Sequence, residues 1–430
     1  MTRSAHPGTR EAVSSTSSSS AATAHLSTKG GGVPARDDGN LLREDLSLPA
    51  AVIYRSRLLN NLHWMQRFAD SRYVILAPHG KTTMTPALFQ LQLQAGAWGL
   101  TLATAPQVAA AYASGVRRVL MANQLIGRRN MAIISELLSA DAETPFEFYC
   151  LVDSAEQAHQ LGRFFDATGQ SLQLLLEVGV PGGRCGCRSD QQIATVRDAI
   201  AQHPSLKLAG IETYEGVIGG ENAVERIGEH LTRVRDLCVD LLQKDAFDTD
   251  QIILTGAGSA WYDLVADVFA DVPTQRILPV LRPGCYLIHD QGIYQDAQHK
   301  VMTRLEGACD LGGDLQSSLE IWAYVQSLPE PGRAILGLGK RDAAFDAGLP
   351  QPELHYRPGQ SAPFAAPAEW RVVSMMDQHS AMEIPVDSDI RVGDIIALST
   401  SHPCLTFDKW RQLCIIDDDF NVIERVNTYF

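Results

Sequence analysis

The sequence predicts an α/β protein with two folded parts, a (β/α)8 barrel of the TIM type followed by a C-terminal β domain. From Leu48 to about residue 300, short runs of β-branched and aromatic residues alternate with longer stretches of helical periodicity. After residue 300 the helical pattern largely disappears, and strand-like segments alternate with turns rich in glycine and proline. A chain of 430 residues is long enough to hold both parts.

Residues 1–44 are expected to form a disordered tail. Serine, threonine, alanine, glycine and proline dominate this stretch, and no aromatic residue precedes Tyr54. Such a segment cannot bury enough apolar surface to offset the entropy that ordering would cost. A transit peptide is the alternative, because Arg3 and Arg10 lie among serines, although the periodicity of an amphipathic targeting helix is missing.

The barrel is expected over residues 45–300. Parallel strands joined by helical crossovers close naturally into a (β/α)8 barrel. An open doubly wound sheet would show the same alternation, but the count stops at eight strands and the chemically interesting residues follow strand ends. The expected strands span residues 73–77, 99–103, 118–122, 147–152, 172–178, 207–212, 251–255 and 277–281, and the expected helices span residues 55–69, 85–95, 106–114, 129–138, 155–167, 191–202, 223–242 and 260–270.

The β domain is expected over residues 301–430. Its Gly/Pro-rich turns separate short apolar runs, which is the pattern of an antiparallel β structure. We also expect the stretch before Tyr54 to pack with this domain. The predicted strands span residues 319–326, 334–338, 370–376, 394–398 and 412–416.

Charge and cysteine content narrow the function classes. The 36 basic and 50 acidic residues give a net charge of −14, which opposes binding to nucleic acid or to anionic lipid. The 8 cysteines are too scattered for a secreted disulfide scaffold, so a reducing cytoplasm is expected. No apolar run approaches the ~18 residues needed to span a bilayer. We therefore expect a cytoplasmic protein with a small-molecule substrate and with neither nucleic acid nor membrane as a partner.

A lysine follows the first expected strand, at Lys81 in the segment His79-Gly80-Lys81-Thr82. Functional groups of a (β/α)8 barrel lie on the loops at the C-terminal ends of the strands. A lone lysine is usually a solvated surface charge. Between an apolar strand and a helix start, however, the amine is expected to be partly desolvated, which favours the neutral form that Schiff-base chemistry needs.

Small residues follow the seventh and eighth expected strands. The first loop carries Gly256, Gly258 and Ser259 and runs into a helix, and the second carries Gly284 and Tyr286. Backbone N–H groups at a helix start can converge on an anion, and a phosphate site after strands seven and eight recurs in this fold. Glycines that only form turns are the alternative. A Schiff-base lysine and a phosphate site at one barrel mouth match the two ends of pyridoxal 5'-phosphate.

Arg184 and Tyr214 follow the fifth and sixth expected strands. Arg184 is positioned to face a pyridine nitrogen and keep it unprotonated, and a surface arginine in a turn is the alternative. Tyr214 is positioned to hydrogen-bond a substrate or cofactor group, or else to line the barrel mouth.

The β domain carries two polar clusters. In Ser401-His402-Pro403-Cys404, an extended backbone would point the imidazole of His402 and the thiol of Cys404 the same way. This pair suits a borderline cation such as zinc, and two protein ligands leave positions open for water and substrate. Asp377-Gln378-His379 would orient a ligand or a substrate carboxylate, or contain a satisfied core histidine.

Taken together, these residues resemble the pyridoxal-phosphate enzymes of fold type III, which combine an alanine racemase-like barrel with a C-terminal β domain. Within that group the chain is most similar to the D-serine dehydratase and D-threonine aldolase-like family. The resemblance covers roughly residues 48–425. It rests on ordered matches at His79-Gly80-Lys81-Thr82, Gly183-Arg184-Cys185-Gly186, Thr213-Tyr214-Glu215-Gly216, Gly256-Ala257-Gly258-Ser259, Arg282-Pro283-Gly284-Cys285-Tyr286, Asp377-Gln378-His379 and His402-Pro403-Cys404.

The resemblance implies a role for each motif. Lys81 would hold pyridoxal 5'-phosphate through a Schiff base, and Arg184 or Tyr214 would lie near its ring. His402 and Cys404 would bind a divalent metal, with zinc favoured and manganese or magnesium as alternatives. A homodimer is also implied. The complete expected cofactor-binding set is His79, Lys81, Arg184, Tyr214, Gly256, Gly258, Ser259, Gly284 and Tyr286.

One position bears on the choice of reaction within the resembling family, and another departs from the family's pattern. Its aldolases tend to carry an acidic residue where Cys404 stands, whereas its dehydratases carry cysteine, so Cys404 favours a dehydratase. Cys285 is a departure, because threonine is common at that position.

The expected reaction is β-elimination of water from D-serine or a related D-3-hydroxy amino acid, followed by hydrolysis of the resulting aminoacrylate to a 2-keto acid and ammonia. The Lys81 amine would remove the α-proton as general base, and the metal would stabilise the departing β-oxygen as a Lewis acid. The main alternative is a D-threonine or D-3-hydroxyaspartate aldolase that releases glycine and an aldehyde. A racemase has no use for a metal-binding pair, and a non-catalytic carrier of the cofactor needs no metal beside the ring.

Overall fold

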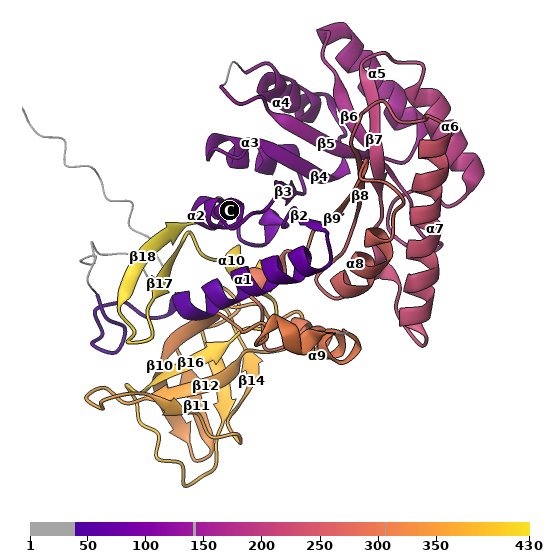
Figure 1. The fold of residues 1–430 in the computed structure, drawn as a ribbon. Coiled ribbons are helices and arrows are strands. Elements are labelled where there is room, and N and C mark those ends of the chain that lie inside the picture. Colours follow the sequence, from indigo (N-terminus) through magenta and orange to yellow (C-terminus); the bar gives the residue numbers. More distant parts are fainter. Residues whose placement is uncertain (1–38, 141–142, 306) are drawn as a thin grey trace, which may run out of the picture.

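A computed structural model of the chain describes residues 39–140, 143–305 and 307–430 (Figure 1). Eight of its strands are parallel and form one sheet, in the order β2-β9-β8-β7-β6-β5-β4-β3. His79 and Thr101 join the two end strands through a parallel bridge, and the N–H of Trp98 donates to the carbonyl of Leu76 at 2.7 Å. The predicted eight-stranded barrel is thereby confirmed. Its strands are β2 (Ile75–Leu76), β3 (Leu100–Leu102), β4 (Arg118–Gln124), β5 (Glu147–Val152), β6 (Leu172–Glu177), β7 (Leu206–Glu212), β8 (Ile252–Gly256) and β9 (Ile277–Leu281).

Amphipathic helices connect these strands and cover the outside of the sheet (Figure 1). Local sequence signals set their ends. Ser189 and Gln192 form a reciprocal capping box at the start of α6, and Gly169 ends α5 in a left-handed conformation that glycine adopts without steric cost. The helices are α1 (Arg55–Ser71), α2 (Pro86–Gln94), α3 (Ala105–Ala113), α4 (Arg128–Leu138), α5 (Ala155–Thr168), α6 (Asp190–Ile200), α7 (Ala223–Gln243) and α8 (Tyr262–Ala270).

The second sheet is mostly antiparallel and forms the C-terminal domain, below the barrel in Figure 1. The apolar strand β1 (Ala50–Tyr54) is entirely buried in this sheet, where it pairs with β10 and β17. The expectation that the stretch before Tyr54 packs with the C-terminal domain is confirmed. The other strands are β10 (Leu319–Glu330), β11 (Arg333–Leu336), β12 (Gln351–Tyr356), β13 (Phe364–Ala365), β14 (Arg371–Met375), β15 (Ser380–Glu383), β16 (Ile395–Ser399), β17 (Gln412–Ile416) and β18 (Val422–Asn427).

The structure departs from the expected elements in three places. The helix α9 (Ile293–Arg304) joins barrel and β domain where no helix was predicted, and the strands β12, β13, β15 and β18 were not predicted either. The expected disordered tail is too long at its C-terminal end, because Asn40 pairs with Asn421 and Leu41 is only 1% exposed. The rest of that tail, residues 1–38, lies outside the described residues.

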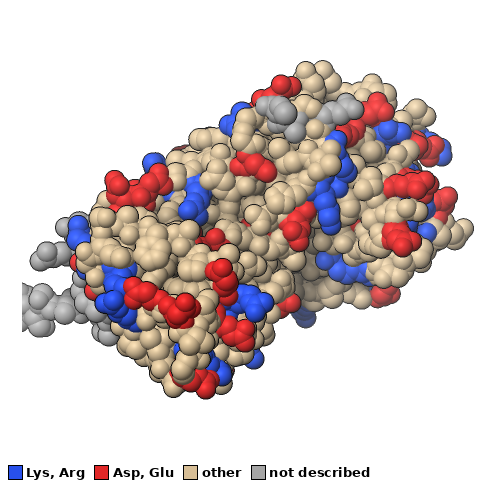
Figure 2. All heavy atoms as spheres, turned by 90° about the horizontal axis from the view of Figure 1, so that it is seen from below, with Lys and Arg blue, Asp and Glu red and all other residues tan. Residues whose placement is uncertain are grey.

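The surface view in Figure 2 shows acidic and basic side chains interspersed over both parts of the visible face. Such mixing gives no extended field of one sign on this face. Among the described residues, no helix has the length and apolar character required to cross a membrane.

Candidate active site

A cavity of about 500 Å³ lies at the C-terminal ends of the barrel strands and extends to the β domain. Loops that follow β2, β6, β7, β8 and β9 contribute to its wall, together with α9 and the short helix α10 (Pro403–Phe407). Phe430 lines it as well, and the N–H of the preceding residue, Tyr429, donates to the carbonyl of Met84 at 2.9 Å. The lining includes His79, Lys81, Thr82, Arg184, Tyr214, Gly258, Ser259, Arg282, Gly284, Cys285, Tyr294, His402, Cys404 and Phe430.

Lys81 lies in a single 3-10 turn, Gly80–Thr82, directly after the first barrel strand. Its neighbours Gly80 and Thr82 are buried, but the Lys81 side chain is exposed in the open cavity. The sequence-based expectation of a partly desolvated amine is therefore not met, because the turn directs the side chain into a space that water can enter.

His79 shapes the same wall. Its Nδ1 atom is buried and has no hydrogen-bond partner among the residues that the structure describes. Burial, with the positive charges of Lys81 and Arg282, holds the pKa of His79 well below its ordinary value. A neutral imidazole with a free buried nitrogen at a cavity wall is a group that an occupant of the cavity would satisfy.

The loops after β8 and β9 form an anion cradle. The backbone N–H groups of Gly284 and Cys285 both point at the hydroxyl of Ser259, at 3.3 and 3.1 Å. A Cβ atom at position 284 would lie 2.7 Å from Thr82 Oγ1 and 3.0 Å from His79 Cβ, so only glycine allows this close approach. Converging N–H groups and a hydroxyl suit a phosphate, and the residues present therefore fit the phosphate end of the expected cofactor.

Two residues of the expected cofactor set lie away from the cavity lining. Gly256 is the last residue of β8, and a Cβ atom there would meet Val265 and Phe269 in the core. Tyr286 is only 3% exposed, and its hydroxyl accepts a hydrogen bond from Gln92 Nε2 at 3.0 Å. The adjoining positions Gly258 and Gly284 do line the cavity, so the strand order located the loops correctly but not each residue within them.

Arg184 and Tyr214 meet at the cavity wall. The guanidinium carbon of Arg184 lies 4.5 Å from the centre of the Tyr214 ring, a cation–π contact between the loops after β6 and β7. Burial and the neighbouring Glu215 raise the pKa of Tyr214. The tyrosine therefore stays a neutral hydroxyl donor at neutral pH.

A buried ion pair lies beneath these residues and was not assigned from the sequence. Arg282 contacts Glu212 and donates from Nε to Thr255 Oγ1 at 3.0 Å. Burial raises the pKa of Glu212, while Arg282 opposes that rise. The signal that would have found Arg282 is an arginine directly after an apolar strand and before Pro283-Gly284.

His402 and Cys404 both line the cavity, although not on an extended segment as predicted. Pro403 begins the helix α10, so His402 is the N-cap residue and Cys404 lies in the first turn. The imidazole and the thiol are hydrogen-bonded to each other, and His402 Nδ1 lies 2.7 Å from Asp346 Oδ2. An imidazole and a thiol held together are donors that suit zinc, so the residues fit the expected metal.

The contacts of this pair shift both pKa values. Hydrogen bonds from Cys285 and His402 lower the pKa of the Cys404 thiol to about 4. Hydrogen bonds to Cys404 and Asp346 raise the pKa of His402 to about 9. Cys404 is therefore a thiolate at neutral pH, which is the form that binds metals.

Two residues beside this pair were not placed in the site by sequence reasoning. The Cys285 Sγ atom lies 3.5 Å from the Cys404 Sγ atom, and the Cys404 thiol contacts Thr82 Oγ1 at 3.4 Å. Tyr294, from the unpredicted helix α9, hydrogen-bonds Cys285. No local sequence pattern signals these contacts, since they join the barrel to the β domain.

The cluster Asp377-Gln378-His379 is neither a ligand-orienting group at this cavity nor a core histidine. These three residues are exposed and form the turn between β14 and β15. The turn packs on Gly339, where a Cβ atom would lie 2.4 Å from the carbonyl oxygen of Asp377. Neither expectation for this cluster holds, because the segment is the exposed connection of a hairpin.

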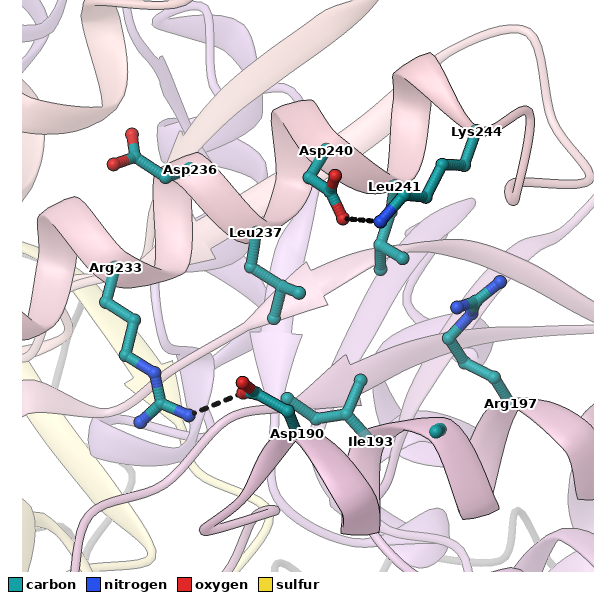
Figure 3. A pocket seen from close by; sticks show the side chains of 10 residues that line it. Asp190, Ile193, Arg197, Arg233, Asp236, Leu237, Asp240, Leu241 and Lys244 are labelled. Atoms are coloured by element: carbon teal, nitrogen blue, oxygen red, sulfur yellow. Dashed lines mark hydrogen bonds and ion pairs between the residues drawn. The ribbon is translucent and has the colours of Figure 1, made fainter.

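A second hollow, of about 450 Å³, lies between α6 and α7 (Figure 3). Two ion pairs lie in its wall: Arg233 contacts Asp190 at 3.1 Å, and Lys244 contacts Asp240 at 2.7 Å. These are ordinary surface ion pairs across and along two helices. The lysine, hydroxyl and thiol groups that could support catalysis gather instead in the cavity at the barrel mouth.

Comparison with known families gives two matches along the chain. The alanine racemase N-terminal domain matches residues 53–288, and the serine dehydratase domain matches residues 318–416. The first match spans most of the barrel and the second lies in the C-terminal domain.

Three individual proteins illustrate this similarity. The chain is 25% identical to a D-threonine aldolase of Arthrobacter sp. over 90% of its own length and 92% of that protein. It is 27% identical to the D-threo-3-hydroxyaspartate dehydratase of Delftia sp. (strain HT23), over 40% of this chain and 44% of the relative. The crystal structure of a D-threonine aldolase from Filomicrobium marinum superposes with a TM-score of 0.76 at 21% identity, covering 92% of this chain and 98% of that one.

The two family matches follow each other in the order that the sequence motifs predicted. The barrel mouth combines a lysine, an anion cradle and a His/Cys pair. The chain belongs to the fold type III pyridoxal-phosphate family of the D-serine dehydratase and D-threonine aldolase type, with an alanine racemase-like N-terminal domain.

Proposed function

We propose that the protein is a metal-assisted, pyridoxal-phosphate-dependent lyase that dehydrates a D-3-hydroxy amino acid, with D-serine as the simplest substrate, to a 2-keto acid and ammonia. One contact carries the proposal. Thr82, the residue after Lys81, touches the thiol of Cys404 at 3.4 Å. The lysine that would hold the cofactor therefore lies close to the pair that would hold the metal, in the same cavity.

The cofactor's end groups have matching partners here. Lys81 would bind its aldehyde carbon, and the cradle of Ser259, Gly284 and Cys285 would bind its phosphate. Pyridoxal phosphate supplies an electron sink for the negative charge that develops at the substrate's Cα atom. Arg184, stacked on Tyr214, adds a fixed positive charge to the same wall.

The chain's own residues would move the protons. The Lys81 amine, released when substrate binds, would take the α-proton as general base. His79 stays neutral because burial and the adjacent cations lower its pKa, so it is suited to accept a hydrogen bond rather than to donate a proton. A divalent metal on His402 and Cys404 would supply Lewis acidity for the β-hydroxyl, which is otherwise a poor leaving group.

An aldolase that cleaves the Cα–Cβ bond of a D-3-hydroxy amino acid is the second candidate. It is favoured by the similarity to a D-threonine aldolase, which extends over 90% of the chain. Cys404 favours the dehydratase instead, because the family's aldolases tend to carry an acidic residue at this position.

The test is a product assay with purified protein, pyridoxal phosphate and zinc or manganese. D-serine, D-threonine and D-3-hydroxyaspartate are supplied separately, and keto acid, ammonia, glycine and aldehyde are measured together. Keto acid and ammonia that disappear in Lys81→Ala and His402→Ala, but persist in the exposed control Lys340→Ala, support the dehydratase. Glycine with aldehyde identifies the aldolase instead.

A further inference from the structure

Cys285 is a buried cysteine that faces the metal-binding pair. It lies in the turn Cys285–Leu287 after β9 and is 3% exposed. Its Sγ atom is 3.5 Å from the Sγ atom of Cys404, far beyond the ~2.0 Å of a disulfide bond. Two thiolates on one tetrahedral zinc ion, each about 2.3 Å from the metal, stand about 3.8 Å apart. The observed separation is close to that edge length.

We propose that Cys285 is a third protein ligand of the metal held by His402 and Cys404, which makes the site a Cys2His zinc centre with one open position. The inference rests on the metal site of the proposed function and extends it. The fourth position would be free for the substrate's hydroxyl, as a catalytic rather than a structural zinc site requires.

The surroundings of Cys285 differ from those of two other buried thiols, Cys150 and Cys238. Cys150 and Cys238 belong to the main hydrophobic core, where a thiol acts as a small apolar side chain. Cys285 instead contacts polar groups, with Thr82 Oγ1 at 4.0 Å and a hydrogen bond to Tyr294. A buried thiol among polar side chains gains little from apolar packing, and a metal would satisfy it.

The backbone of Cys285 is already fixed. Its N–H donates to Ser259 Oγ at 3.1 Å, which ties the residue to the anion cradle. The same residue therefore presents its backbone to the phosphate end of the site and its thiol to the metal end. A ligand on such a fixed turn loses little conformational freedom when it coordinates a metal.

The other donors are arranged around Cys404. Its thiol contacts both Cys285 and His402, so it stands between the two. Asp346 holds Nδ1 of His402 and leaves Nε2 for a metal, the usual arrangement of a metal-binding histidine and its carboxylate partner. Side-chain rotation of His402 toward Cys285 would bring all three donors to one ion.

A second thiolate, from Cys285, would change the choice of metal. Thiolate ligands favour zinc, whereas magnesium and manganese prefer oxygen ligands. Two thiolates would also neutralise the charge of a divalent ion in this largely buried place. Threonine, which is common at position 285 in the resembling family, would offer only a hydroxyl.

The test uses the metal alone, added to full-length protein that has been stripped with a chelator and kept reduced with a phosphine. Cobalt(II) reports thiolate ligands through its charge-transfer absorption, and X-ray absorption of the zinc form counts sulfur neighbours at about 2.3 Å. The variants are Cys285→Ser, Cys285→Thr, Cys404→Ser and His402→Ala. Cys238→Ala, a buried cysteine in α7, is the matched control.

We expect two sulfur neighbours in the parent protein and one in Cys285→Ser. The charge-transfer absorption should fall by about half, and zinc affinity should fall at least ~100-fold, the upper end of what loss of an outer-shell partner costs. Cys238→Ala should change neither. Circular dichroism and cofactor absorbance of Cys285→Ser show whether the fold and the cradle survive.

Two results would overturn the inference. The first refutes only the third ligand, and the second also refutes the metal site of the proposed function. One sulfur neighbour in the parent, lost in Cys404→Ser but kept in Cys285→Ser, refutes the third ligand and leaves the His402/Cys404 site intact. Metal binding that is unchanged in both Cys404→Ser and His402→Ala refutes the metal site of the proposed function as well.

Discussion

The buried carboxylate of Glu215 accepts a hydrogen bond from the backbone N–H of Gly258 at 2.8 Å, and a second one from Ala257 at 3.0 Å. Ala257 has a φ of 77°, a left-handed conformation that is unfavourable for alanine. These two hydrogen bonds from the loop to Glu215 stabilise the strained conformation of the loop between β8 and α8. The shape of the anion cradle depends on a residue that is absent from the cavity wall.

Glu215→Gln should therefore loosen this loop. Glutamine has one side-chain oxygen, whereas the N–H groups of Ala257 and Gly258 each bond to a different oxygen of Glu215. The NH2 group of glutamine would therefore face one of these two N–H donors. We expect a loss of about 1–3 kcal/mol in the free energy of unfolding and weaker binding of pyridoxal phosphate. Guanidinium unfolding and cofactor titration measure both. Glu221→Gln, at an exposed position six residues on, is the control, and equal behaviour of the two variants would contradict the role of Glu215.

The ion pair between Arg282 and Glu212 should be costly to break from one side. Both side chains are almost fully buried, at 4% and 2% exposure. Arg282→Met would leave an uncompensated carboxylate in the core, at a cost of about 3–5 kcal/mol in the free energy of unfolding. The exposed pair of Arg333 and Glu330 supplies the control, because Arg333→Met should cost at most about 1 kcal/mol. Similar losses in the two variants, measured by guanidinium unfolding, would refute the prediction.

Glu177 should make stability fall as pH rises. Burial, followed by the nearby Glu212, raises the pKa of Glu177 to about 8. An unfolded glutamate releases its proton near pH 4.3. Between about pH 5 and 8, Glu177 is therefore protonated in the folded state but ionised in the unfolded state. Each pH unit in this window then costs up to about 1.4 kcal/mol of folding stability from this group.

Glu177→Gln tests this relation by removing the titrating group. Its free energy of unfolding should decline less between pH 5 and 8 than that of the parent, as followed by urea unfolding at several pH values. The exposed Glu136→Gln should keep the parent's slope. Parallel curves for Glu177→Gln and the parent would show that Glu177 does not hold an extra proton in the folded protein.

Asp290 should be required for the start of α9. Its Oδ1 atom accepts hydrogen bonds from the N–H groups of Gly292 and Tyr294 at 3.0 Å and of Gln295 at 3.2 Å. Asp290→Ala leaves these donors unsatisfied and should cost about 1–2 kcal/mol of stability. Asp290→Asn keeps an acceptor oxygen and should lose less. Thermal unfolding and hydrogen exchange of α9 check the order of the variants, and an equal loss in both would contradict the capping role.

The barrel was predictable because its signals are local. Each strand and helix carries its own periodicity, so the run expected at residues 172–178 became β6 (Leu172–Glu177). The helix α9 was not predicted, because its sequence lacks such a local signal. Only Gln298 and Val301 are buried among its residues, which leaves little apolar periodicity to recognise.

The site was predictable only in part. Strand order alone places Lys81 and Ser259 at one barrel mouth, because each follows the carboxyl end of a parallel strand. The contact of Cys285 with Cys404 joins positions 119 residues apart, and no periodicity within either segment encodes it. At His402, the following proline was the overlooked signal, since proline favours the first turn of a helix.

Asp346 should raise the zinc affinity of the His402/Cys404 pair proposed to hold the metal, because it contacts His402. Its Oδ2 atom lies 2.7 Å from His402 Nδ1, an arrangement that fixes the ring and makes the other nitrogen more basic. Asp346→Asn keeps the shape of this contact but removes its charge. Zinc affinity, measured by competition with a chelator, should fall about 10- to 100-fold. The thermal unfolding midpoint should stay close to the parent's, because 41% of the Asp346 side chain is exposed. Asp387→Asn, an exposed change in the same domain, should leave both quantities unaltered. Unchanged zinc affinity in Asp346→Asn would mean that His402 does not bind the metal through the nitrogen that faces away from Asp346.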